Sequence, residues 1–126
     1  MSDIKSERLP IIMGNWKMHG SLSMVEKMMA SLTHQSAIDA HVDVALCLPF
    51  PYLFLGHRLI ENSNIKIGAQ NVSRHSSGAY TGEVSAEMLL EQGCHYVLVG
   101  HSERRQLYHE TSEEVGLKAK AVMVAG

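Results

Sequence analysis

The residues best suited to chemistry lie where an apolar run meets the start of a helix-like segment. Residues 96–99 have the character of a buried strand and lead into Gly100. His101 follows at once, ahead of Ser102 and three charged residues. A parallel α/β enzyme presents an imidazole in this way, at the carboxyl end of a strand and beside the positive end of a helix. The pattern therefore predicts a functional histidine.

Two interpretations of His101 follow from this setting. In one, the ring only forms a hydrogen bond that fastens a loop, as most histidines in such places do. In the other, Ser102 caps a helix that begins at Glu103, and the backbone N–H groups of that helix disfavour the imidazolium and keep the ring neutral. A neutral imidazole can donate to a carbonyl oxygen and polarise it without giving up its proton. We favour the second interpretation, in which Gly100 lets the chain turn closely.

A second polar group, Asn15 and Lys17, follows the first apolar run, residues 9–13. A lone lysine usually extends into solvent, and that interpretation stays open. In a parallel barrel, however, the first and fourth strands end at the same mouth, which would place Lys17 beside His101. Glu103 is the nearest carboxylate that could pair with Lys17. Alternatively, Glu103 interacts only with the dipole of its own helix.

Strand-like and helix-like runs alternate along the chain, which predicts four consecutive βα units and hence a parallel sheet. Expected helix starts are marked by Ser23 with Glu26, by Ser85 and by Thr111 with Glu114. The whole chain, residues 1–126, is expected to be a single domain. A small doubly wound sheet would fit the same order of elements. The expected strands cover residues 9–13, 42–48, 65–69 and 96–99.

Composition narrows the class of protein. The net charge is −2 and the basic residues are scattered, so the sequence predicts no binding to nucleic acid or to an anionic membrane. The most apolar window, residues 44–55, contains two prolines and is shorter than the ~20 residues of a membrane helix. The first eight residues are mixed in charge and do not resemble a signal peptide. We therefore expect a soluble, cytoplasmic protein.

Metal and cofactor chemistry has little support in the sequence. The eight histidines show no metal-ligand spacing, and no glycine-rich nucleotide loop follows any expected strand. Cys47 and Cys94 form no Cys-x-x-Cys pair, which is typical of a reducing compartment. Ser102 lacks the setting of a nucleophile elbow. We expect neither a cofactor nor a metal ion.

Four motifs in the chain carry a resemblance to a known family. They are Gly14-Asn-Trp-Lys-Met18, Gly68-Ala-Gln-Asn71, Gly78-Ala-Tyr-Thr-Gly-Glu83 and Val99-Gly-His-Ser-Glu-Arg-Arg105. In order and spacing, over residues 10–126, they resemble the triosephosphate isomerase family. The resemblance implies an α/β fold of the parallel TIM-barrel type, represented by its first four βα units.

The resemblance also implies roles for the residues singled out above. In the family, a histidine at the position of His101 is the electrophile that shuttles protons between substrate oxygens. Asn15 and Lys17 would bind substrate, with Lys17 placing a positive charge near a phosphorylated, enolate-forming molecule. Glu103 would support Lys17. The implied reaction interconverts dihydroxyacetone phosphate and glyceraldehyde 3-phosphate in glycolysis and gluconeogenesis, without cofactor or metal.

Family members are usually dimers in which a long loop after the third strand enters a pocket of the neighbour. Here that loop would run from Asn71 to Glu83, with Thr81 near its tip. A polar surface insertion would have the same composition. The resemblance therefore implies a homodimer, and the polarity of the loop alone does not.

The catalytic glutamate of the family, its mobile lid and most of its phosphate site belong to later βα units than these four. We therefore interpret the sequence as the N-terminal half of such an enzyme, completed by a complementary C-terminal half or by a second copy. The alternative is a non-catalytic half-barrel module that serves in assembly. A different phosphate-sugar barrel enzyme is a distant third interpretation.

Overall fold

The computed structural model describes residues 8–34 and 41–126. Its centre is one sheet of four parallel strands in the order β1-β2-β3-β4, so each strand lies beside the next one in the chain. This confirms the predicted parallel sheet, and the sequential order differs from that of a doubly wound sheet. The strands are β1 (Ile11–Asn15), β2 (Asp43–Leu48), β3 (Ile65–Ala69) and β4 (Cys94–Val97).

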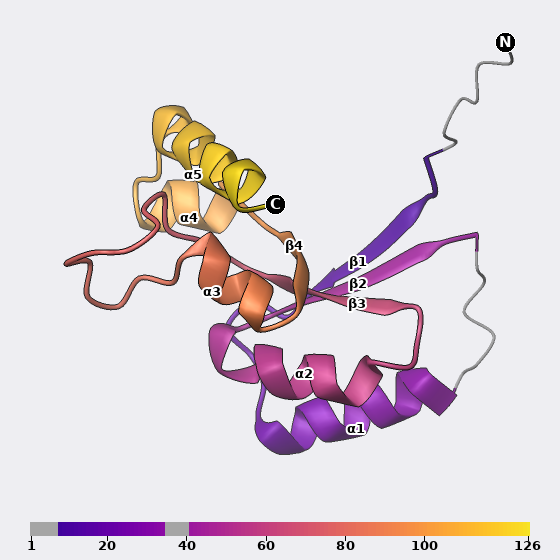
Figure 1. Cartoon of the computed structure of the whole chain (residues 1–126). Coiled ribbons are helices and arrows are strands. Elements are labelled where there is room, and N and C mark those ends of the chain that lie inside the picture. The colour runs from indigo at the N-terminus through magenta and orange to yellow at the C-terminus, as the bar shows by residue number, and fades with distance from the viewer. Residues whose placement is uncertain (1–7, 35–40) are drawn as a thin grey trace, which may run out of the picture.

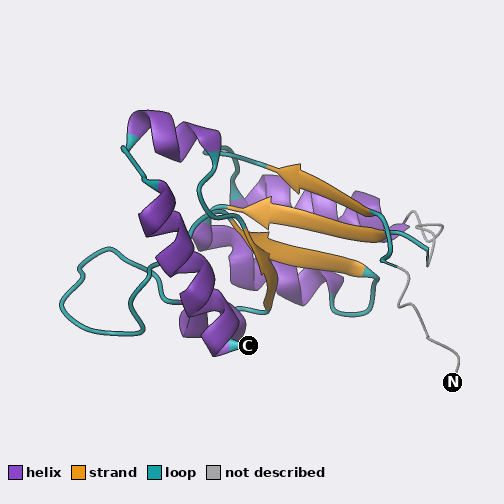
Figure 2. Cartoon of the chain, turned by 90° about the horizontal axis from the view of Figure 1, so that it is seen from above, coloured by secondary structure: helices purple, strands orange, loops and turns teal. Residues whose placement is uncertain are grey.

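Helices lie mainly along one face of this sheet. Figure 1 shows α1 and α2 side by side beneath β1, β2 and β3, while α3 lies next to β4. In Figure 2 the strands lie in front of α1 and α2, and no described helix covers their opposite face. The helices are α1 (Leu22–His34), the short 3₁₀ turn η1 (Phe50–Tyr52), α2 (Leu53–Ile60), α3 (Ala86–Glu91), α4 (Ser102–Leu107) and α5 (Ser112–Ala125).

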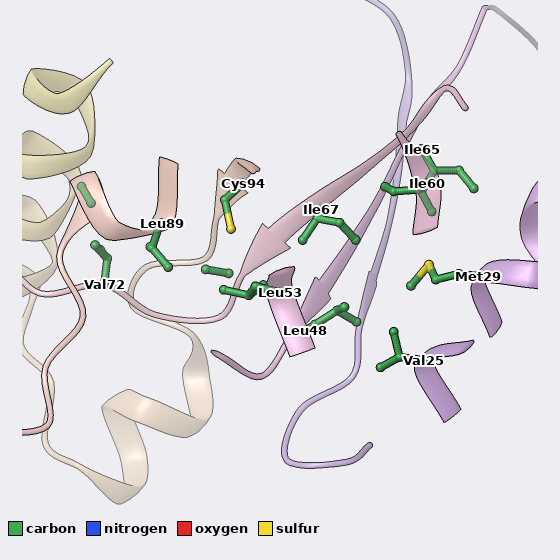
Figure 3. Packing of buried hydrophobic residues seen from close by; sticks show 12 residues of the cluster. Val25, Met29, Leu48, Leu53, Ile60, Ile65, Ile67, Val72, Leu89 and Cys94 are labelled. Carbon is green, nitrogen blue, oxygen red and sulfur yellow. The ribbon is translucent and has the colours of Figure 1, made fainter. Parts of the chain in front are cut away.

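The core forms where α1 and α2 pack against the strands. Leu48 of β2 and Ile67 of β3 point toward the helices (Figure 3). They belong to one buried cluster with apolar residues of α1 and α2 that are spaced one or two helical turns apart, such as Val25 and Met29. Gly56 lets α2 approach closely, because a Cβ there would lie 2.9 Å from a methyl group of Leu48. The largest side chains that are fully buried include Met29, Leu48, Leu53, Ile67 and Val25.

Two of the predicted helix caps are confirmed and two are wrong. The Ser85 side chain accepts from the backbone N–H of the third residue of α3, and Thr111 does the same for α5. At α1, however, the cap is Ser21 and not Ser23, since the Ser21 hydroxyl accepts the N–H of Met24 at 3.1 Å. At α4, His101 itself takes the capping position that was expected of Ser102.

Candidate active site

The carboxyl ends of the strands surround one cleft of about 360 Å³. Residues from the loops after β1, β3 and β4 line it, as parallel strands require when they end on the same side. Asn15, Lys17, His101 and Glu103, the four residues predicted to bind substrate or to act in catalysis, all lie on its wall. The structure therefore brings the predicted residues together from opposite ends of the chain. Their roles stay predictions.

Lys17 has a backbone conformation that lysine rarely adopts, with φ at 55°. Such a left-handed residue costs on the order of 1–3 kcal/mol and persists only where its surroundings hold it. The Lys17 N–H donates to the Asn15 side-chain oxygen at 2.9 Å. The Gln70 amide donates to the same oxygen at 3.1 Å and to the Lys17 carbonyl at 2.8 Å. Asn15 and Gln70 together hold this turn in place.

Gln70 was not among the residues predicted for the site. It follows β3 directly, and it lines the cleft. Its signal was present in the Gly68-Ala-Gln-Asn71 motif, but a glutamine after a strand has no distinctive chemistry of its own. The fold brings three acceptors to the Gln70 amide. Two are the Asn15 side-chain oxygen and the Lys17 carbonyl, and the third is the Cys47 carbonyl at 3.3 Å.

The expected pair between Lys17 and Glu103 forms. The Lys17 ammonium lies 2.6 Å from a carboxylate oxygen of Glu103, and both side chains are about half exposed. The hydrogen bond from Lys17 holds the pKa of Glu103 below its usual range; partial desolvation acts in the opposite direction, and the charge of Lys17 adds to the lowering. Glu103 is therefore a carboxylate at neutral pH and a weak base.

His101 is held so that one ring nitrogen can only accept a hydrogen bond. Its Nδ1 accepts the backbone N–H of Glu103 at 3.1 Å, at the first turn of α4. An Nδ1 that accepts carries no proton, so in this arrangement the ring is neutral and its proton is on Nε2. A Glu103 carboxylate oxygen lies 3.7 Å from the same nitrogen, a contact that would be an ion pair only with a protonated ring. The shorter backbone contact defines the tautomer.

Gly100 makes the turn that aims His101. Its φ is +64°, and a Cβ there would lie 2.6 Å from a methyl carbon of Val115 on α5. Both polar groups of its backbone are bound, because the N–H donates to Glu110 at 3.2 Å and the carbonyl accepts from Arg105 at 3.0 Å. The position therefore requires glycine for its conformation and for its space.

We expect Gly100→Ala to lower the free energy of unfolding by on the order of 2–6 kcal/mol, the sum of a left-handed alanine and an overpacked contact. Gly116→Ala is the matched control, because Gly116 lies inside α5 with no atom near the added methyl group. It should raise stability by roughly 0.5–1 kcal/mol. Urea denaturation of both variants measures the difference. Equal stability of the two would contradict this account of Gly100.

A buried carboxylate, Glu110, ties the loop after β4 to α5. Its Oε2 accepts from Arg104 Nε at 2.8 Å and from Lys118 Nζ at 2.9 Å. Burial is the largest influence on the pKa of Glu110 and raises it, but the hydrogen bonds and charges of Arg104 and Lys118 outweigh burial and leave the pKa lowered. Arg104, Arg105 and Glu110 thus brace the loop after β4 through side-chain hydrogen bonds.

Sequence reasoning missed Lys118, whose side chain is only 5% exposed. Its ammonium also donates to the Asn71 side-chain oxygen at 2.9 Å, at the base of the loop after β3. The rest of that loop folds on itself: the rings of His75 and Tyr80 stack 3.8 Å apart and within 3° of parallel. Thr81 and Glu83 are exposed. The role of Asn71, Thr81 and Glu83 in a dimer stays a prediction.

The two cysteines are poor nucleophiles. Cys47 and Cys94 are free and buried, and burial raises the pKa of each thiol to about 11, with the nearby Cys47 adding to the effect at Cys94.

Among the residues that the structure describes, no cluster of histidine, cysteine and acidic side chains could hold a metal ion. No helix in the same part of the chain is long and apolar enough to cross a membrane.

Known proteins are similar to this chain in sequence and in fold. The curated triosephosphate isomerase of Bordetella pertussis is 49% identical over 119 residues, which are 94% of this chain and 48% of that protein. For Dechloromonas aromatica the identity is 50% over 119 residues, covering 94% of this chain and 47% of the relative. The chain thus spans about half the length of the curated relatives it matches.

The solved structures give the same result for the fold. The crystal structure of triosephosphate isomerase from Bartonella henselae matches with a TM-score of 0.85 and 36% identity, over 93% of this chain and 48% of that one. This match confirms the predicted parallel fold of the TIM-barrel type, with four βα units corresponding to about half of the solved chain. A family model described as triosephosphate isomerase matches residues 10–126, and the chain therefore belongs to the triosephosphate isomerase family.

Proposed function

We propose that this chain supplies the electrophilic and substrate-binding part of an active site that interconverts dihydroxyacetone phosphate and glyceraldehyde 3-phosphate. The observation that carries the proposal is the geometry of His101. Its Nδ1 is occupied by the Glu103 N–H, and within the described part of the chain no group bonds its Nε2. The ring lines the cleft that also contains Asn15 and Lys17.

The chemistry follows from charge. Removal of a proton from the carbon next to a carbonyl leaves negative charge on the carbonyl oxygen, giving an enediolate. The Nε2–H of a neutral His101 can donate to that oxygen and transfer its proton there. Nε2 then takes the proton of the neighbouring hydroxyl, which restores the neutral ring and moves the negative charge to the other oxygen. The Lys17 ammonium adds a fixed positive charge at the mouth. These contacts strengthen as charge develops, which is what accelerates a reaction.

Positioning is built into the backbone around these groups. The left-handed turn at Lys17 is held by Asn15 and Gln70, and Glu103 pairs with the ammonium. A charge whose partners are already in place loses little energy to reorganisation when the substrate becomes anionic. In this proposal Glu103 and Gln70 support Lys17, while Asn15 both supports it and contacts the substrate.

A chimera tests the proposal. Residues 10–126 of this chain would replace the matching segment of the Bordetella pertussis relative, which is 49% identical. We expect the chimera to isomerise dihydroxyacetone phosphate. His101→Gln should lower kcat/KM by ~10²–10⁴-fold, and Lys17→Met by a comparable factor.

Lys120→Met serves as the control, since it removes an exposed lysine of α5 outside the cleft. Its kcat/KM should equal that of the chimera. Circular dichroism of each variant verifies that the fold is intact. A folded His101→Gln or Lys17→Met chimera with a rate within a few-fold of the parent would refute the assigned roles.

A further inference from the structure

We infer that Lys118 is a positioning residue that orients the His101 ring through Glu110 and the backbone N–H of Gly100. The inference rests on the proposed function of His101, and it concerns a residue outside the cleft. The chain of contacts is continuous: Lys118 Nζ to Glu110 Oε2 at 2.9 Å, then Glu110 Oε1 to the Gly100 N–H at 3.2 Å. Gly100 immediately precedes His101.

The orientation of the ring depends on its own hydrogen bond and on the turn at Gly100. The Glu103 N–H on Nδ1 fixes the ring to the first turn of α4. The turn is held at two points, because the Gly100 N–H donates to the buried Glu110 and the Gly100 carbonyl accepts from the exposed Arg105 side chain. If the Gly100 N–H were released from Glu110, the turn at Gly100 could rotate. The hydrogen bond from the Glu103 N–H to His101 Nδ1 would then lose its alignment. Glu110 is thus the anchor of the backbone that carries His101.

Lys118 is what keeps Glu110 in that place. Both side chains are nearly fully buried, at 5% and 4% exposure, whereas Arg104, the other cation on this carboxylate, is 32% exposed. A buried carboxylate that loses a buried partner becomes an uncompensated charge and moves toward water or toward its remaining cation. Arg104 lies on the exposed side, so loss of Lys118 would draw Glu110 away from Gly100.

The same ammonium reaches a second loop. Lys118 Nζ donates to Asn71 Oδ1 at 2.9 Å. Asn71 comes immediately after Gln70, the residue that holds the turn at Lys17. One buried ammonium therefore connects the loop after β3, which carries Gln70, with the carboxylate that holds the Gly100 N–H.

The test reads the tautomer of His101 in the full chain by long-range ¹H–¹⁵N correlation after selective ¹⁵N-histidine labelling, with His101→Gln to assign the signal. We expect a single pattern, with Nε2 protonated and Nδ1 accepting. In Lys118→Met the pattern should change to exchange between tautomers, and the Gly100 amide should exchange with solvent at least tenfold faster. Lys120→Met, an exposed lysine on the same helix, should change neither signal.

The double variant Glu110→Gln with Lys118→Met separates positioning from stability. It removes both buried charges. The amide oxygen of the new side chain can still accept the Gly100 N–H, while Arg104, which is 32% exposed, turns from the amide N–H₂ toward water. We expect it to fold and to regain the single His101 pattern, even if Lys118→Met alone does not fold.

Three results would overturn the inference: an unchanged His101 pattern in a folded Lys118→Met, a double variant that keeps the defect, or one that fails to fold. These measurements need no substrate, so they stay distinct from the proposed function, whose failure would appear in the rates of the chimera.

Discussion

Prepared on their own, these 126 residues should isomerise dihydroxyacetone phosphate at no more than a trace rate. The reaction needs a base that takes a carbon-bound proton, and such a base typically contributes ~10²–10⁴-fold. Among the described residues that line the cleft, Glu103 is the only carboxylate. Its hydrogen bond from Lys17 lowers the pKa of Glu103, which weakens it as a base.

The measurement is a coupled assay on protein purified from a host that lacks its own isomerase. A His101→Gln preparation made in parallel sets the background, because any rate that does not depend on His101 appears in both samples. Turnover near that of a full-length relative, lost in His101→Gln, would show that the cleft contains a base that we have not recognised.

The second large effect concerns association. At micromolar concentration we expect this chain to bind a complementary C-terminal half where one is present, and otherwise to associate with itself. β1 and β4 are the edges of the described sheet, and each leaves one row of backbone groups without a strand partner. Apolar side chains of β1 are also exposed, with Ile12 at 64% and Ile11 at 45%. Exposed apolar surface beside an open edge favours association.

Sedimentation at increasing concentration measures the effect, and hydrogen exchange shows whether β1 and β4 become protected. Ile12→Lys should weaken self-association, because a charge on an edge strand opposes pairing. Leu22→Lys is the control, since Leu22 is an apolar residue of similar exposure, at 60%, at the start of α1 and not on an edge strand. A compact monomer with both edge strands strongly protected would contradict the prediction.

Sequence patterns predicted the elements well where local chemistry decides the outcome. The strand at Ile65–Ala69 has the predicted bounds, and Ser85 and Thr111 cap their helices as expected. The bounds of the other three strands differ from the predicted ones by one or two residues. β4, for example, begins at Cys94, and its register with β3 changes between Ile67 and Gly68. Such shifts depend on pairing between strands, which a single segment does not encode.

The sequence predicted the polar residues that line the cleft, but not Gln70 and Lys118, whose hydrogen bonds hold the loops around it. His101, Lys17, Asn15 and Glu103 follow apolar strands, and the carboxyl ends of parallel strands must meet. Lys118 lies in α5, where a lysine ordinarily faces water. Its burial depends on a carboxylate and an amide from two other segments, so no local pattern distinguishes it from Lys120.

The order of the strands also has a consequence for how the molecule assembles. Because every strand pairs with its neighbour in the chain, the sheet can grow by one βα unit at a time as the polypeptide emerges from the ribosome. The cleft cannot form in such steps, since Lys17 comes from the first unit and Glu103 from the last. The turn at Lys17 can be fastened once Gln70 has been made, whereas its charge stays unpaired until α4 is in place. The pair of charges in the cleft is thus complete only after the fourth βα unit has formed.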